Sequence, residues 1–141
     1  MAEPTVWTFF YGSFINLDVL KQVDCVPGRY EVAKLSGFDI RIAPLANLVR
    51  SEQHCVYGVV ATVTHEDLRR LYSQAWVGTY LPEPVLVETR DGTWRAAFCY
   101  VAPAMEPRPP ADDYIDRIVG PARQYGFPEW YIARLESFRP R

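Results

Sequence analysis

The stretch VWTFFYGSF, residues 6–14, decides the fold. Residues 6–11 are β-branched or aromatic almost without a break, which is typical of a strand buried on both faces. Gly12 and Ser13 then end the strand, and Asn16 is a favourable N-cap for a short helix. The sequence therefore predicts a Tyr-Gly-Ser turn at the end of a buried strand.

Strand patterns dominate the region that follows this turn. Alternating or β-branched stretches cover residues 30–35, 38–42, 55–63, 84–89 and 94–101. The Asp91-Gly92 pair predicts a tight turn that joins the last two stretches in a hairpin. Residues 64–67 resemble a capping box, which predicts a helix that begins there and carries Leu68, Leu71 and Tyr72.

A proline-rich run separates these strands from a helical tail. Residues 103–110 contain four prolines, which exclude a helix interior or a central strand, so we expect a surface connection. Residues 112–137 are predicted to form two short helices, split around residues 126–128. Strands first and helices last predict a single α+β domain over residues 1–141, with a closed or strongly curled sheet and helices packed outside it.

Composition and charge exclude several classes of function. A chain of 141 residues that is 49% hydrophobic can bury the core of one domain. The net charge is −2 and no basic run occurs, so we expect no nucleic-acid partner and no electrostatic attachment to a membrane. No stretch reaches the roughly 18 apolar residues of a spanning helix, and the start does not read as a signal peptide. The cytoplasm is therefore the expected location.

The cysteines and histidines of the chain point away from a disulfide framework or a metal site. Cys25, Cys55 and Cys99 are odd in number and widely spaced, so we interpret them as small buried hydrophobes. His54 and His65 have neither a cysteine nor a carboxylate at metal-ligand spacing. The sequence therefore predicts no bound metal.

The turn formed by Tyr11, Gly12, Ser13 and Phe14 is the strongest candidate for a binding site. Glycine permits backbone conformations in which successive N–H groups point the same way, and such groups form a concavity that binds anions. A helix that starts at Asn16 would add its positive end. The ligand group implied is a carboxylate or a phosphate. The alternative is an ordinary strand-to-helix turn that binds no ligand, because short glycine motifs also occur in such turns. Ser13 lacks a G-x-S-x-G frame, so we interpret it as a loop donor rather than a nucleophile.

The same turn resembles the opening signature of the gamma-glutamylcyclotransferase-like family. VYGVV at residues 56–60 is similar to the central strand of that family, and LRRL at residues 68–71 is similar to the helix that follows it. Tyr80, the strand from residue 84 and the hairpin that ends at Tyr100 match its later β region. Residues 114–131 resemble its closing segment, so the likeness covers nearly the whole chain in a consistent order.

The resemblance implies a fold, a reaction and a set of site residues. The fold is α+β, a small mixed β-barrel flanked by helices. The reaction is intramolecular acyl transfer on a γ-glutamyl amine or a related amide, which releases 5-oxoproline and an amine. No cofactor is implied, because the nucleophile and the electrophile share one molecule. Tyr11, Gly12, Ser13, Phe14 and Tyr80 would bind a small-molecule substrate through its carboxylate.

The chain departs from the family at the residue that moves the proton. The family usually has L-D-x-x-E-G after the helix, with the glutamate as general acid and base, whereas residues 71–76 read LYSQAW. Ala75 therefore stands at the glutamate position, and alanine cannot transfer a proton. Glu83 is the nearest replacement, held between Pro82 and Pro84, which stiffen the backbone. We predict Glu83 as the catalytic residue, with a solvated surface glutamate as the alternative and Glu88 as a weaker candidate.

Three functions are consistent with these observations. The first is a cyclotransferase, which requires Glu83 to point into the cavity formed by residues 11–14. The second is a binding or regulatory module without catalysis, in which a carboxylate ligand sits at the loop with no protein carboxylate in reach. The third is a protein-interaction domain, for which an exposed apolar surface around Trp76 or Trp130 would be evidence.

Overall fold

The core of the computed structural model, which describes residues 3–74 and 79–140, is a closed barrel of five strands. The strands are β1 (Thr5–Phe10), β2 (Tyr30–Ile42), β3 (Ala46–Thr64), β4 (Leu81–Thr89) and β5 (Trp94–Val101). Their order around the barrel is β1-β3-β2-β4-β5. All neighbours run antiparallel except β1 and β5, which run parallel. The predicted mixed barrel is therefore confirmed.

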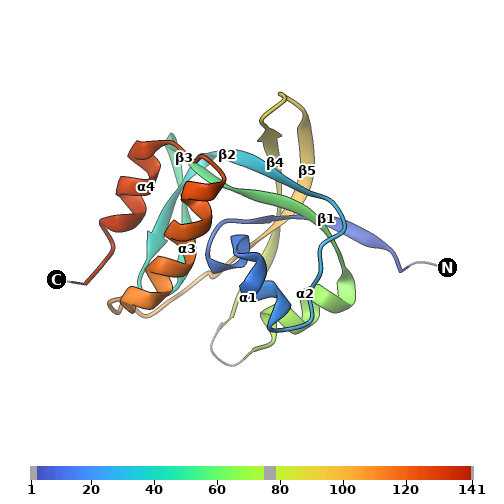
Figure 1. Ribbon diagram of the computed structural model, residues 1–141, viewed down its shortest axis with the longest axis horizontal. Coiled ribbons are helices and arrows are strands. Elements are labelled where there is room, and N and C mark those ends of the chain that lie inside the picture. Colours follow the sequence, from blue (N-terminus) through green and yellow to red (C-terminus); the bar gives the residue numbers. More distant parts are fainter. Residues whose placement is uncertain (1–2, 75–78, 141) are drawn as a thin grey trace.

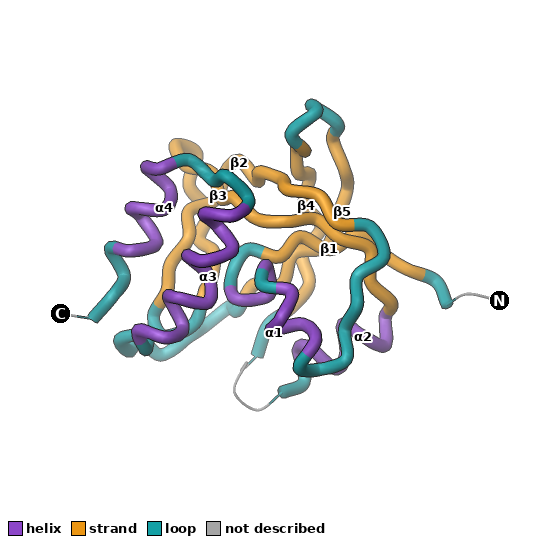
Figure 2. The backbone as a smooth tube through the Cα atoms, viewed as in Figure 1, coloured by secondary structure: helices purple, strands orange, loops and turns teal. Residues whose placement is uncertain are grey.

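The helices lie outside the strands of the barrel (Figure 1). They are the 3-10 helix η1 (Ser13–Ile15) and the α-helices α1 (Leu17–Lys21), α2 (His65–Tyr72), α3 (Asp112–Gln124) and α4 (Glu129–Glu136). Figure 1 shows α3 and α4 beside β2 and β3, and the β4–β5 hairpin projecting away from them. Figure 2 shows the same division between helices and strands. The α+β class is confirmed, and none of the described helices is long and apolar enough to span a membrane.

Alternation along the strands fills the barrel with every second side chain. Phe9 and Cys99, which lie opposite each other on β1 and β5, are both fully buried. Gly58 on β3 leaves space for the Phe9 ring, because a Cβ at residue 58 would lie 2.9 Å from that ring and 2.1 Å from the carbonyl oxygen of Phe10. The glycine in VYGVV is therefore required by close packing of β1 against β3.

The two long strands differ from the sequence prediction. Residues 30–35 and 38–42 belong to one strand, because the break expected at Gly37 is a β-bulge with a register shift between Ser36 and Phe38. Gly37 has a φ of +90°, which favours glycine. Strand β3 begins at Ala46 rather than at Cys55, because residues 46–50 pair with residues 38–42 of β2.

The predicted caps are present, and the first α-helix begins after Asn16 as expected. The Thr64 hydroxyl oxygen accepts a hydrogen bond from the Asp67 N–H at 3.0 Å, which confirms the cap of α2. Asn16 caps α1 through the Asp18 N–H at 2.9 Å. The 3-10 helix η1 lies between the turn and α1, so the contribution of the α1 N-terminus to the turn stays a prediction.

The tail has the predicted pair of helices, with Gly126 between them at a φ of +75°. Trp130 and Tyr131 lie on different faces of α4, as their adjacency requires. Trp130 is 53% exposed and Tyr131 is buried. The cysteines are all free, with Cys25 and Cys99 buried as expected and Cys55 only partly so.

The barrel is closed between β2 and β4 by a short contact. The two strands pair only at Ala33–Thr89 and Lys34–Glu88. In contrast, β4 stays paired with β5 from Leu81 to Glu88. Residues 81–87 of β4 therefore have no second partner strand among the described residues.

Candidate functional site

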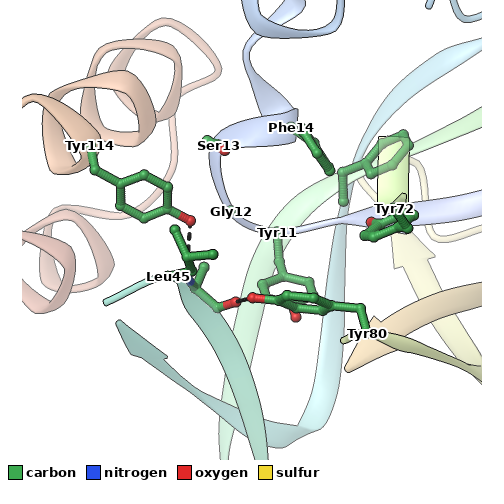
Figure 3. Close-up of a pocket in the computed structure, with 10 residues that line it drawn as sticks. Tyr11, Gly12, Ser13, Phe14, Leu45, Tyr72, Tyr80 and Tyr114 are labelled. Atoms are coloured by element: carbon green, nitrogen blue, oxygen red, sulfur yellow. Dashed lines mark hydrogen bonds between the residues drawn. The ribbon is translucent and has the colours of Figure 1, made fainter. Parts of the chain in front are cut away.

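A cavity of about 40 Å³ lies where β1 ends. It is several times larger than the roughly 10–15 Å³ that one water molecule requires. Residues from distant parts of the chain line it: Phe10, Tyr11, Gly12, Ser13, Phe14, Leu45, Ala46, Tyr72, Tyr80 and Tyr114. Figure 3 shows these side chains around the loop that follows β1. The five residues predicted for substrate binding thus meet at one cavity.

Gly12 allows the β2–β3 turn to approach the end of β1. Its φ of −105° lies outside the left-handed region, so backbone freedom does not explain the glycine. A Cβ at residue 12 would lie 2.7 Å from the Ala46 Cβ and 3.4 Å from the Tyr114 hydroxyl. The absence of a side chain therefore brings Ala46 into the wall of the cavity.

Two tyrosines hold the backbone of Ala46 in that wall. The Ala46 N–H donates a hydrogen bond to the Tyr114 hydroxyl oxygen at 2.9 Å. The Tyr80 hydroxyl donates to the Ala46 carbonyl oxygen at 2.5 Å. In Figure 3 the Tyr80 and Tyr114 rings approach Leu45 and Ala46 from different sides. Both polar groups of one peptide residue are thereby satisfied by side chains from α3 and from the segment before β4.

Further aromatic side chains form the opposite wall. The Tyr11 hydroxyl donates to the Tyr100 carbonyl oxygen at 2.7 Å. The Tyr72 ring stacks on the Tyr100 ring with centroids 3.9 Å apart, and it meets the Phe14 ring edge to face at 5.5 Å. Tyr72 therefore connects the end of α2 to both β5 and the loop after β1.

The tyrosines of the cavity are neutral at physiological pH. Burial raises the pKa of Tyr11 and Tyr72 well above the usual value, and nearby Cys99 and other tyrosines add to the rise. Burial also raises the pKa of Tyr114, although hydrogen bonds with Ala46 and Ser13 oppose the rise. These side chains therefore offer uncharged hydroxyl groups and do not act as bases near pH 7.

Glu83 does not line this cavity. It lies on the face of β4 that carries the buried Val87, opposite Cys99 on β5. Its carboxylate forms an ion pair with Arg50 of β3 and keeps 31% of its side chain exposed. Burial raises the pKa of the Cys99 thiol, and the Glu83 charge adds to that rise. The catalytic role of Glu83 stays a prediction.

No carboxylate side chain is present among the described residues that line the cavity. Glu88, the weaker candidate, lies elsewhere and pairs with Lys34 at 3.9 Å. Two residues of the sequence predictions lie outside the described residues. They are Ala75, which was compared with the family's glutamate, and Trp76, which was a candidate for an exposed apolar surface. Among the residues that are described, no cluster of three His, Cys, Asp or Glu side chains is placed to hold a metal ion.

Sequence reasoning missed several residues of the cavity. Leu45 and Ala46 lie in a turn between strands and have no distinctive sequence signal. Tyr72 and Tyr114 come from helices far from the loop in sequence. The family resemblance offered a signal for both, because Tyr72 directly follows the LRRL stretch and Tyr114 opens the stretch that resembles the closing segment.

A small mixed barrel with a Tyr-Gly-Ser loop at the end of its first strand defines the gamma-glutamyl cyclotransferase class of fold. A solved structure described as a gamma-glutamyl cyclotransferase matches with a TM-score of 0.82 and 23% identity, over 98% of this chain and 90% of that chain. The human uncharacterized protein loc79017 matches with a TM-score of 0.84 and 24% identity, over 99% and 90%. An AIG2-like mouse protein matches with a TM-score of 0.59 and 19% identity, over 79% and 82%.

At these identities, the similarity to solved structures shows the fold alone. The sequence itself identifies the family: the chain belongs to the AIG2-like family, whose profile matches residues 55–135. No curated protein matches the chain.

Proposed function

We propose that the protein binds a γ-glutamyl amine or a related amide in the cavity at the end of β1 and cyclises it. The products are 5-oxoproline and an amine. The observation that carries the proposal is that Tyr11, Gly12, Ser13, Phe14 and Tyr80 line one cavity. The shared fold with a gamma-glutamyl cyclotransferase supports the same reaction class.

The cavity has the chemistry to hold the carboxylate of such a substrate. In the proposal, the backbone of residues 11–14 faces the carboxylate, and neutral tyrosines surround it without adding negative charge. Hydrogen bonds to an ionised acceptor are about twice as strong as those between neutral groups. An aromatic wall around the carboxylate also keeps water away, which strengthens each of these bonds.

The reaction moves one proton and exchanges one C–N bond for another. The substrate's α-amine attacks its own γ-carbonyl carbon and closes a five-membered ring. The bond from that carbon to the leaving nitrogen breaks, and the proton lost by the attacking amine is returned to the leaving nitrogen. Holding both groups in attack geometry supplies much of the rate, so the protein's further task is the proton transfer.

We propose Glu83 for that transfer, which requires the carboxylate to leave Arg50. The Arg50 side chain is 74% exposed, and exposed ion pairs contribute only about 0–1 kcal/mol. Exchanging this partner for the substrate's ammonium group therefore costs little.

A second candidate function is carboxylate binding without turnover. It is favoured by the absence of a carboxylate among the described residues of the cavity and by the pairing of Glu83 with Arg50. In this function the loop of residues 11–14 binds the ligand, and no proton transfer follows.

The test is 5-oxoproline release from a panel of γ-glutamyl amines, combined with calorimetric binding of the same compounds. We expect turnover by the wild type, a loss of at least ~100-fold in Glu83→Gln, and retained activity in the matched control Arg50→Gln, which keeps the carboxylate. Binding without turnover by the wild type would establish the second function. Neither binding nor turnover would contradict both.

A further inference from the structure

A second cavity, of about 320 Å³, lies away from the end of β1 and shares no lining residue with the first. Three parts of the chain line it: strands β2 and β3, the tip of the β4–β5 hairpin, and the turn between α3 and α4. Figure 1 shows that turn beside β2 and β3. The volume of the cavity is at the lower end of the roughly 300–1,000 Å³ range of small-molecule sites. The proposed function does not account for it.

The charged groups of this cavity carry an excess of positive charge. Lys34, Glu88 and Arg90 line it. Lys34 and Glu88 are 3.9 Å apart and each about one-third exposed, so this pair is loose and exchangeable. Arg90 has no carboxylate within ion-pair distance among the described residues, unlike Arg95 nearby, which contacts Glu31 at 2.9 Å. Two cations and one anion favour an anionic ligand.

The Arg90 side chain lies against the turn between α3 and α4. Gly126 adopts a φ of +75°, and a Cβ there would lie 3.2 Å from the Arg90 Nη2 atom. The guanidinium group therefore packs against the backbone of the turn, at the rim of the cavity. A residue with a side chain at 126 would be strained and would crowd that group.

The other wall of the cavity is apolar and aromatic. The Tyr57 and Phe127 rings lie 5.7 Å apart with their planes inclined by 40°. Val32 and Pro128 extend the same wall. Flat apolar surface beside a pair of cations suits a ligand that has a flat body and one acidic group, because each part of the ligand then meets its complement.

We propose that this cavity is a second ligand site, for a small carboxylic acid with a flat apolar body. The carboxylate binds between Lys34 and Arg90, and the body packs against Tyr57 and Phe127. Glu88 gives up its loose contact with Lys34 when the ligand binds. This site is independent of the reaction proposed above, and its occupant does not need an amine.

An NMR titration of the full chain with benzoate tests the site. The Gly92 and Gly126 amides report on this cavity, and the Gly12 amide reports on the first. We expect saturable shifts at Gly92 and Gly126, with the dissociation constant raised about tenfold or more in Arg90→Gln and in Lys34→Gln. The control Lys21→Gln, on exposed α1, keeps the wild-type constant. Benzamide, which lacks the charge, binds more weakly than benzoate.

Each other outcome overturns the proposal. Shifts at Gly92 and Gly126 that rise linearly with benzoate indicate an adventitious anion only. Saturable shifts that persist unchanged in Arg90→Gln/Lys34→Gln show that these cations do not form the site. Shifts confined to Gly12 assign benzoate to the first cavity. Because both substituted side chains are partly exposed, the dispersion of each variant's spectrum verifies that the fold is intact.

Discussion

The Tyr72 ring lies flat on the Tyr100 ring, with centroids 3.9 Å apart and planes inclined by 9°. This stack joins the end of α2 to β5 at the wall of the cavity.

Truncating Tyr72 separates the role of its ring from that of its hydroxyl. We expect Tyr72→Leu to lower the free energy of unfolding by about 2 kcal/mol, because ring contacts to Tyr100 and Phe14 are lost. Tyr72→Phe keeps the stack and should cost less than about 1 kcal/mol. Urea denaturation of the two variants measures the difference, and equal losses would show that the stack contributes nothing.

Replacing Gly12 with alanine tests the close approach at the cavity wall. The new methyl group would meet the Ala46 Cβ at 2.7 Å, so we expect Gly12→Ala to destabilise the protein by about 1–3 kcal/mol and to weaken ligand binding. Ala46→Gly alone should cost about 0.5–1 kcal/mol. In the double variant the clash disappears, so its loss should be smaller than the sum. Strict additivity in chemical denaturation would refute the contact.

The tip of the β4–β5 hairpin should respond to acid. Hydrogen bonds from the Thr89 hydroxyl and then from Thr93 lower the pKa of Asp91 to about 2. Because the folded-state pKa is below the usual value near 4, the stabilisation is present above about pH 4 and is lost as pH falls towards 2. An NMR titration of the Gly92 amide should show a midpoint near 2. In Asp91→Asn the transition should vanish, whereas a midpoint near 4 would contradict the hydrogen bonds.

The Asp39–Arg134 ion pair connects β2 to α4. The Asp39 carboxylate is only 9% exposed and accepts a hydrogen bond from the Arg134 guanidinium at 2.9 Å, with Arg41 farther away at 4.0 Å. Arg134→Met leaves the carboxylate almost buried with its weaker partner alone, so we expect a loss of about 1–3 kcal/mol. The double variant Asp39→Asn/Arg134→Met should recover part of the stability that Arg134→Met loses. A double-mutant cycle without coupling would show that the pair is unimportant.

Much of the fold was predictable because local patterns agree with the tertiary structure. The buried run of β1, the cap of α2, the hairpin at Asp91-Gly92 and the two helices of the tail all have strong local signals. The first half of β3 was not, because residues 50–54 are mostly polar and exposed, and only residues 46–50 of this half pair with β2. Gly37 is misleading for a related reason, since a bulge and a strand end use the same residue.

The site was predictable at its contiguous part and at Tyr80, which the family resemblance indicated. The loop after β1 is one sequence motif, so Tyr11 to Phe14 could be identified together. Ala46 and Tyr114 contribute through backbone and hydroxyl contacts that arise only when the β2–β3 turn and α3 meet the loop. The position of Glu83 depends on which side of β4 faces Arg50, which no local pattern specifies.

The short contact between β2 and β4 affects the tendency of copies of the protein to aggregate through this edge of the sheet. Pro82 and Pro84 lie on the part of β4 that has no second partner strand. Proline has no amide hydrogen, so Pro82 and Pro84 cannot donate a backbone hydrogen bond. Because β4 stays paired with β5 along this stretch, the edge that lacks these two donors is the one that faces away from β5. An extended peptide that approaches this edge finds no donor at either position. The edge of β4 that faces away from β5 is thereby protected against edge-to-edge aggregation.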